Sequence, residues 1–130
     1  MHILGLGVDL ADVGRVGTLL ARYPGFAERC FTEHEREYAF RFAKPERRLA
    51  ARFAGKEAVM KSLGTGWRRV RWTDVEISGG GRPTVRLTGT AARRAEMMGV
   101  TEVLVTITHT DNTALVMAVA VGEQAPSMST

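Results

Sequence analysis

A helical pattern from Arg47 to Leu63, which runs into a Gly64-Thr65-Gly66 loop, constrains the fold of this chain more than any other segment. At about 100° per residue, its large apolar side chains line up in one stripe. Glu57 and Lys61 are four residues apart and lie together on the neighbouring row. Two alanines share that row, so we expect it to be shallow, with room for a ligand or partner close against it. The stripe consists of Leu49, Phe53, Met60 and Leu63, and the alanines are Ala50 and Ala54.

The pair of Glu57 and Lys61 allows two interpretations. A glutamate and a lysine at this spacing often form only a solvated pair, which stabilises the helix by about 0.2–0.5 kcal/mol. Gly64 is then an ordinary residue to end a helix. An acid, a base and a glycine loop in succession also suit a site that binds phosphate and a metal ion.

The N-terminal segment 1–9 is typical of a buried strand. Gly5 and Gly7 interrupt its apolar residues where a backbone can approach another element closely. We expect the strand to end at Asp9, and Asp12 to cap a following helix. The Gly-x-Gly pattern is not a dinucleotide-binding fingerprint, because Leu10 stands in place of the third glycine.

Asp9 also allows two interpretations. A carboxylate at the end of a strand can be a plain turn or capping residue. Together with Glu57 on the helix, Asp9 can instead hold magnesium, which takes one or two protein carboxylates and its other ligands from water and substrate phosphates.

The rest of the sequence predicts an α+β fold, because the helical patterns cluster first and the strand patterns come mainly later. Thr32 and Glu35 form the signature of a capping box at the start of one helix. Two short strands flank the glycine-rich turn 79–83, and residues 110–112 join the last two strands. The predicted helices are 13–23, 33–42, 47–63 and 90–98, and the later predicted strands are 75–77, 84–87, 103–108 and 114–121.

Three segments resemble one known family in their order and spacing. "GLGVDLADVGRV", "RFAGKEAVMKSLGTG" and the late "ITHT" are similar to motifs of the holo-acyl-carrier-protein synthases, the short-type phosphopantetheinyl transferases. The resemblance extends from Ile3 to about Val121. It implies the fold of these enzymes, with an antiparallel sheet and a long central helix. It also implies a homotrimer with active sites between protomers.

The resemblance further implies a reaction and its residues. The phosphopantetheine arm of coenzyme A is transferred to a serine of apo acyl carrier protein, and adenosine 3′,5′-bisphosphate leaves. Asp9 and Glu57 are implied as ligands of magnesium, or alternatively manganese, and Lys61 as a cation on the pyrophosphate or the departing oxygen. Whether Glu57 also acts on the serine proton, through a metal-bound water, stays open. The implied catalytic residues are Asp9, Glu57 and Lys61, and the implied coenzyme A site consists of Arg52, Lys61, Gly64, Thr65, Gly66, His109 and Thr110.

The resemblance also implies a contact surface for the acidic carrier protein. We expect Arg15, Arg22 and Arg29, with Phe26, to form this surface, because Arg15 and Arg22 are seven residues apart on one helix face. The alternative is that these arginines are ordinary solvated side chains.

Length and composition limit the class of protein. A chain of 130 residues is the length of one domain, which we assign to residues 1–122, followed by a polar tail over 123–130 that we expect to be disordered. No apolar run reaches the length of a membrane span, and no signal peptide is visible. Cys30 is the only cysteine. We therefore expect a cytoplasmic protein without a membrane partner.

The net charge of +4 and the pI of about 9.8 favour acidic partners. A nucleic-acid-binding module is one rival interpretation, supported by the basic and aromatic segment 67–72. Its charge is not concentrated, however: residues 1–61 hold 11 basic and 8 acidic residues, and the remainder holds 7 and 6. We therefore expect no nucleic-acid partner. A non-catalytic scaffold of the same fold is the other rival, and the presence of Asp9, Glu57 and Lys61 argues against it.

Overall fold

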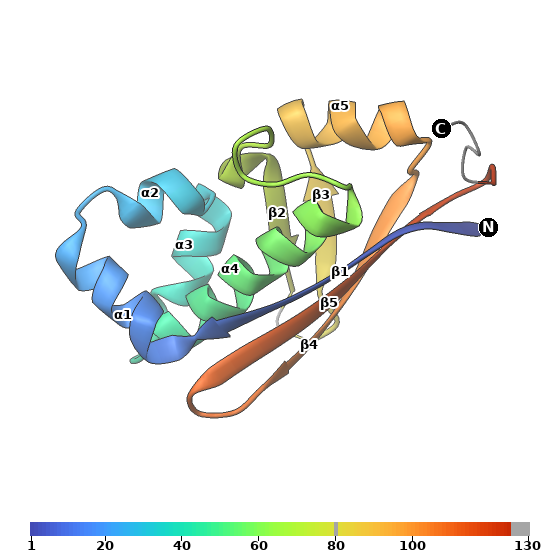
Figure 1. Ribbon diagram of the computed structural model, residues 1–130. Coiled ribbons are helices and arrows are strands. Elements are labelled where there is room, and N and C mark those ends of the chain that lie inside the picture. The colour runs from blue at the N-terminus through green and yellow to red at the C-terminus, as the bar shows by residue number, and fades with distance from the viewer. Residues whose placement is uncertain (80, 126–130) are drawn as a thin grey trace.

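The computed structural model describes residues 1–79 and 81–125, and within them the chain forms one three-stranded sheet, one hairpin and a set of helices around a long central helix (Figure 1). The central helix α4 packs across one face of the sheet. The elements in chain order are β1 (His2–Asp12), α1 (Val13–Arg22), α2 (Phe26–Cys30), α3 (Glu33–Ala39), α4 (Pro45–Ser62), the 3-10 helix η1 (Trp72–Asp74), β2 (Val75–Ser78), β3 (Thr84–Leu87), α5 (Gly89–Met98), β4 (Glu102–His109) and β5 (Thr113–Gly122).

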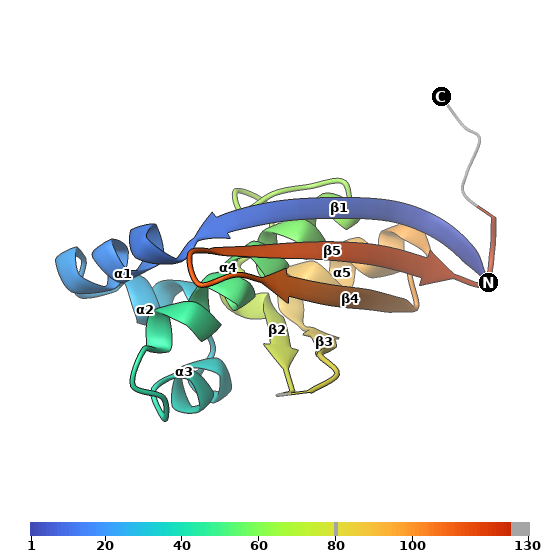
Figure 2. The same ribbon diagram turned by 90° about the horizontal axis from the view of Figure 1, so that it is seen from below.

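The sheet has the antiparallel order β1-β5-β4, so the two chain-end strands lie next to each other (Figure 2). Its inner face, toward α4, is made of small buried residues such as Gly7, Ala118 and Ala120. Its outer face carries large apolar side chains that remain exposed. Small residues on the inner face allow the central helix to sit close to the sheet.

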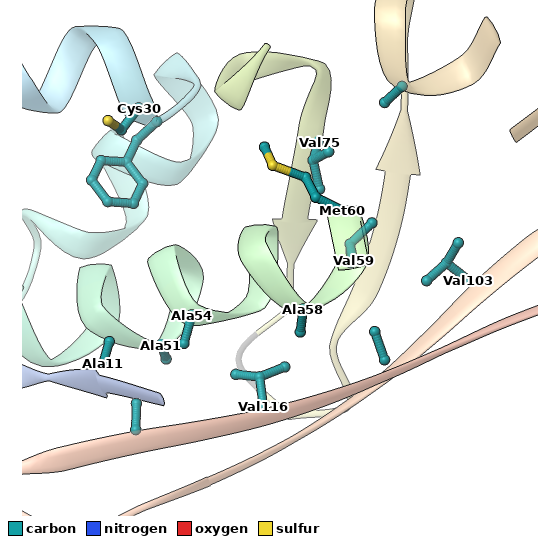
Figure 3. Packing of buried hydrophobic residues seen from close by; sticks show 14 of the residues in the cluster. Ala11, Cys30, Ala51, Ala54, Ala58, Val59, Met60, Val75, Val103 and Val116 are labelled. Atoms are coloured by element: carbon teal, nitrogen blue, oxygen red, sulfur yellow. The ribbon is translucent and has the colours of Figure 1, made fainter. Parts of the chain in front are cut away.

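The closest approach between helix and sheet is made by β1 and α4. A Cβ atom added to Gly7 would lie 1.9 Å from the carbonyl oxygen of Ala58, and one added to Gly5 would lie 1.8 Å from that of Ser62. Only glycine fits at such distances, which confirms the prediction that these two positions mark a close backbone contact. Alanines of α4 and residues of the sheet, among them Ala58 and Val116, fill the space beside this contact (Figure 3).

A buried ion pair fixes the other side of α4. The Nζ atom of Lys56 lies 2.7 Å from Oε1 of Glu35, and both side chains are fully buried. Lys56 also donates hydrogen bonds to the carbonyl oxygens of Trp72 and Val75, and Glu35 accepts one from the backbone N–H of Ile77. The two charged groups contact each other and are also hydrogen-bonded to the backbone around them. These bonds connect α4 to α3 and to the β2–β3 hairpin.

The elements predicted from the sequence are confirmed in type and order, with shifts at their ends. The capping box is present, with Thr32 and Glu35 bonding each other's backbone N–H. The first strand does not end at Asp9 but continues to Asp12, because β5 pairs with it over this whole length. Asp12 caps α1, as predicted, by accepting from the N–H of Arg15.

Two other expectations change. The row of Ala50 and Ala54 is not a shallow surface, because both alanines are fully buried in the core. The predicted helix 33–42 ends at Ala39. Most of the predicted tail, residues 126–130, lies outside the described residues. Among the residues that the structure describes, no helix combines the length and apolar character needed to cross a membrane.

The close contact of β1 with α4 gives a first prediction. We expect Gly7→Ala to lower the free energy of unfolding by about 3 kcal/mol or more, because the new methyl group would overlap the backbone of α4. Gly25→Ala is the matched control: nothing lies within 4 Å of its added Cβ. Urea unfolding of both variants measures the difference. Equal stabilities would show that β1 does not need the close contact.

Candidate active site

The structure brings three of the predicted site residues together where β1 crosses α4. The Nζ atom of Lys61 lies 3.2 Å from Oδ1 of Asp9 and donates a hydrogen bond of 3.1 Å to the carbonyl oxygen of Val8. Asp9 pairs in the sheet with Val116, whose side chain is buried under α4, so both point to the helix side of the sheet. Glu57 comes one helical turn before Lys61 and faces the same place.

Burial and the neighbouring Asp9 both disfavour the charged form of Glu57. Partial burial and, after it, the neighbouring Asp9 together raise the pKa of Glu57 to about 7, although Lys61 and Arg15 act in the opposite direction. A carboxyl group with a pKa near neutrality is typical of a site that is short of positive charge. Asp9 and Glu57 therefore form an acidic pair whose charge Lys61 compensates only in part.

This donor set fits a magnesium ion. Two close carboxylates in a partly exposed position leave room for water and for phosphate oxygens, which magnesium prefers as its remaining ligands. Within residues 1–79 and 81–125, no group of three or more His, Cys, Asp or Glu side chains is placed to hold a metal. A magnesium ion held by Asp9 and Glu57 would therefore take its other ligands from water or from phosphate oxygens.

A pocket of about 580 Å³ contains this acidic pair. One wall comes from α1 and the residues before it, including Asp12 and Arg15. The other wall is aromatic, with Phe53 and Trp72 stacked at 4.7 Å between ring centroids and 13° between planes. The sequence had placed Phe53 only in an apolar stripe and had left the role of Trp72 open. The stacking of the two rings could not be predicted from the sequence, because they come from distant segments and only the folded structure brings them together.

A different pocket, of about 460 Å³, holds Arg52, His109 and Thr110. Arg52 and Glu57 are roughly 140° apart around α4 at 3.6 residues per turn, and His109 ends the sheet strand opposite β1. Arg52 is buried, donates to the carbonyl oxygen of Gly79 at 3.1 Å and lies over the ring of Tyr38. Within one protomer, these predicted coenzyme A residues therefore lie across the helix from the acidic pair.

The glycine loop after α4 lines a third pocket. We predicted that the backbone N–H groups of this loop bind phosphate, but only some of these groups are free to do so. The N–H of Gly64 donates to the carbonyl oxygen of Lys61 and that of Thr65 to the carbonyl oxygen of Met60, because they end the helix. Gly64 has the positive φ of 67° that this helix end requires. Of the three predicted residues, Gly66 alone keeps its N–H outside these bonds.

The residues predicted to contact a carrier protein lie together on α1 and α2. Arg15, Arg22 and Arg29 are exposed. Phe26 is half-buried and packs with its ring centroid 5.8 Å from those of Phe31 and Phe53, so it supports the wall of the pocket that holds the acidic pair. Of the three arginines, Arg15 lines that pocket, and their contact with a carrier protein stays a prediction.

Cys30 does not supply a nucleophile. The side chain is buried, and this burial raises the pKa of its thiol to about 11. A thiol with so high a pKa is protonated at neutral pH and is unreactive.

The raised pKa of Glu57 gives a prediction about stability and pH. A carboxyl group whose pKa rises on folding contributes stability below its unfolded value of about 4.5, and this contribution is lost as the pH increases through about 7. In a metal-free buffer with chelator, Glu57→Gln should therefore gain stability relative to the original chain between pH 4.5 and pH 8. Glu96→Gln, at an exposed position of α5, is the control. Urea unfolding at both pH values measures this, and a difference that does not vary with pH would contradict the close carboxylate pair.

Comparisons with known proteins agree over nearly the whole chain. A family model, the 4'-phosphopantetheinyl transferase superfamily, matches residues 5–119. The holo-acyl-carrier-protein synthase of Solibacter usitatus is 49% identical over 112 residues, which cover 83% of this chain and 90% of that protein. The crystal structure of the holo-ACP-synthase from Plasmodium yoelii has a TM-score of 0.83 at 27% identity and covers 95% of this chain and 98% of that one. The synthase from Bacillus anthracis, solved in complex with CoA (3',5'-ADP), has a TM-score of 0.76 at 28% identity and covers 93% and 98%. This chain belongs to the 4'-phosphopantetheinyl transferase superfamily.

Proposed function

We propose that this chain is a holo-acyl-carrier-protein synthase, which transfers the phosphopantetheine group of coenzyme A to a serine of apo acyl carrier protein and releases adenosine 3′,5′-bisphosphate. The observation that carries the proposal is the meeting of Asp9, Glu57 and Lys61 where β1 crosses α4. The coenzyme A bound to the Bacillus anthracis relative supports the choice of substrate. The free thiol of Cys30 is compatible with the reducing cytoplasm, where we place the reaction.

In this reaction the serine oxygen forms a bond to the phosphorus that carries the pantetheine arm, and the bond from that phosphorus to the bisphosphate breaks. Asp9 and Glu57 would hold magnesium, or alternatively manganese. Bound there, the metal supplies Lewis-acid stabilisation for the pyrophosphate. Lys61, which is half-exposed beside Asp9, provides a cation for the oxygen that departs. As the alternative to its role as a metal ligand, Glu57 would receive the serine proton as a general base.

The separation of the predicted residues around α4 supports a site shared between protomers. Arg52 and His109 lie in a pocket across the helix from the acidic pair. If Arg52, His109 and Asp9 all contact one coenzyme A molecule, residues of a second copy must complete the site of the first. This is the reason to propose an oligomer and not an isolated protomer.

The outer face of the sheet supplies a surface for that oligomer. Leu6, Val8 and Leu10 of β1 are 64%, 49% and 61% exposed, and Met117 of β5 lies opposite Val8 in the register. Leu115 and Leu104 extend the same apolar face. A continuous apolar face of this kind usually marks a protein–protein contact, and we propose that it lies within the homotrimer.

The direct test of the proposed function is a transfer assay. The purified protein is incubated with coenzyme A, magnesium and apo acyl carrier protein, and the carrier is analysed by intact-mass spectrometry. We expect the carrier to gain the mass of one phosphopantetheine group only when the protein and magnesium are both present. A carrier of unchanged mass would contradict the proposal.

Lys61 gives a second prediction about the reaction. We expect Lys61→Ala to lower kcat by roughly a hundredfold while the KM for coenzyme A changes little, because the cation acts mainly on charge that develops in the transition state. Lys44→Ala, an exposed lysine before α4, is the matched control and should keep kcat. If KM alone increased in Lys61→Ala, Lys61 would bind the ground state and our assignment would be wrong.

The oligomer gives a further prediction. We expect Met117→Asp to convert the trimer to smaller species, because a carboxylate on the apolar face of β5 loses its hydration when the face is covered. Met97→Asp, on the exposed side of α5, makes the same chemical change elsewhere and should leave the trimer intact. Light scattering coupled to size exclusion measures both. A variant at Met117 that remains trimeric would place the interface on another surface.

A further inference from the structure

A hollow of about 680 Å³ lies beside the pocket of the acidic pair, and its rim is basic. It is formed by the loop after α4, which contributes Trp67, Arg68 and Arg69, and by α5, which contributes Arg93 and Arg94. We propose that this basic hollow is a second docking contact for the acidic surface of the carrier protein. The inference rests on the proposed function. It adds a second region, separate from α1, to the surface of this chain that contacts the carrier protein.

The charge of the basic hollow is uncompensated within the described part of the chain. Arg68, Arg69 and Arg93 are exposed, and no carboxylate among residues 1–79 and 81–125 lies within 4.0 Å of their guanidinium groups. Arg94 is held in place by a 2.7 Å hydrogen bond to the carbonyl oxygen of Leu63. Asp74, beneath the start of α5, already accepts two hydrogen bonds from Thr90. The rim therefore offers positive charge to an external partner.

Trp67 joins the basic hollow to the pocket of the acidic pair. Its side chain is 57% exposed and lines both spaces. On the far side of the same pocket stands Arg15 of α1. A partner protein that places a serine in the pocket covers about 800 Å² of this surface in an interface of standard size. We expect a contact area of this size to include both Arg15 of α1 and the arginines of the basic hollow.

The chemistry of the basic hollow favours acidic protein side chains over a phosphate group as the bound partner. Gly64, which lines the hollow, follows the C-cap residue of α4, and the negative helix dipole at this end disfavours a deeply bound anion. The N–H groups of Gly64 and Thr65 are already bonded within the chain, so of the three loop residues only Gly66 could offer its N–H to a phosphate. The long arginine side chains at the rim remain, and they suit carboxylates presented on the surface of a folded partner.

The basic hollow and the proposed oligomer surface lie on different sides of the sheet. The loop after α4 and helix α5 lie on the same side of the sheet as α4 (Figure 1). The exposed apolar residues of β1 and β5 lie on the other face, as the strand register and their exposure show. A trimer built through the outer face of the sheet therefore leaves the basic hollow open to a carrier protein.

The test measures binding without turnover. An apo acyl carrier protein of bacterial fatty-acid synthesis, with its acceptor serine replaced by alanine, is titrated calorimetrically into the full-length protein at low and high salt. Arg69→Glu and Arg93→Glu are compared with Arg41→Glu, an exposed arginine beyond α3 that makes the same change in net charge. We expect each rim variant to raise Kd by roughly fivefold at low salt and much less at high salt, because exposed charges are screened. The Arg41→Glu variant should bind as the original chain does.

Steady-state kinetics separates the alternatives. If the proposal holds, the KM for the carrier protein increases in both rim variants while the KM for coenzyme A stays the same. An increase in the KM for coenzyme A alone would assign the basic hollow to the nucleotide and overturn the proposal. Equal carrier affinities of the rim variants and the control, or no carrier binding by the original chain, would overturn it as well. Carrier binding that depends on Arg69 and Arg93 in a protein without transfer activity would instead refute the proposed reaction and leave the docking surface standing.

Discussion

The backbone contact between β1 and α4 is the constraint on which the rest of the structure depends. Gly5 and Gly7 let the strand lie against the carbonyl groups of Ser62 and Ala58, at distances that any Cβ atom would forbid. Asp9 follows Gly7 by two residues, and side chains in a strand alternate. The same close contact that packs the strand therefore turns the carboxylate of Asp9 toward Lys61 and Glu57 on the helix.

The rotation of α4 about its axis is fixed from the opposite side by the pair of Glu35 and Lys56. Removing one partner of a fully buried and hydrogen-bonded ion pair leaves an uncompensated charge, which typically costs about 3–5 kcal/mol. Lys56 directly precedes Glu57 in the chain, so the bond that holds one side chain in the core also directs the next toward the pocket. Packing and chemistry are thus coupled along two successive residues.

Much of this arrangement could be predicted from the sequence, because local rules govern it. The spacing of Glu57 and Lys61, the glycines before Asp9 and the capping box of Thr32 each follow from the geometry of one element. The burial of Ala50 and Ala54 could not be predicted in this way. A helical wheel gives the relative direction of a side chain but not how many neighbouring elements surround the helix, and β1, β5 and α1 together cover far more of α4 than one stripe.

The relative positions of residues in distant segments also could not be predicted from local rules. The family resemblance implies one coenzyme A site that includes Arg52, His109 and the glycine loop, and within this chain these residues line two different pockets. Helix periodicity is enough to place Arg52 and Glu57 on different faces of α4. It could not show that β4 brings His109 to the face of Arg52, since this depends on the strand order β1-β5-β4.

We propose that the crossing of β1 over α4 creates a metal site. Crystals of the protein grown with manganese and coenzyme A test it most directly, because at its absorption edge manganese scatters anomalously much more strongly than the sulfur and phosphorus atoms present. The account predicts one anomalous peak within coordination distance of carboxylate oxygens of both Asp9 and Glu57, next to the pyrophosphate. A peak on coenzyme A that neither carboxylate contacts, or one held by other side chains, would contradict it.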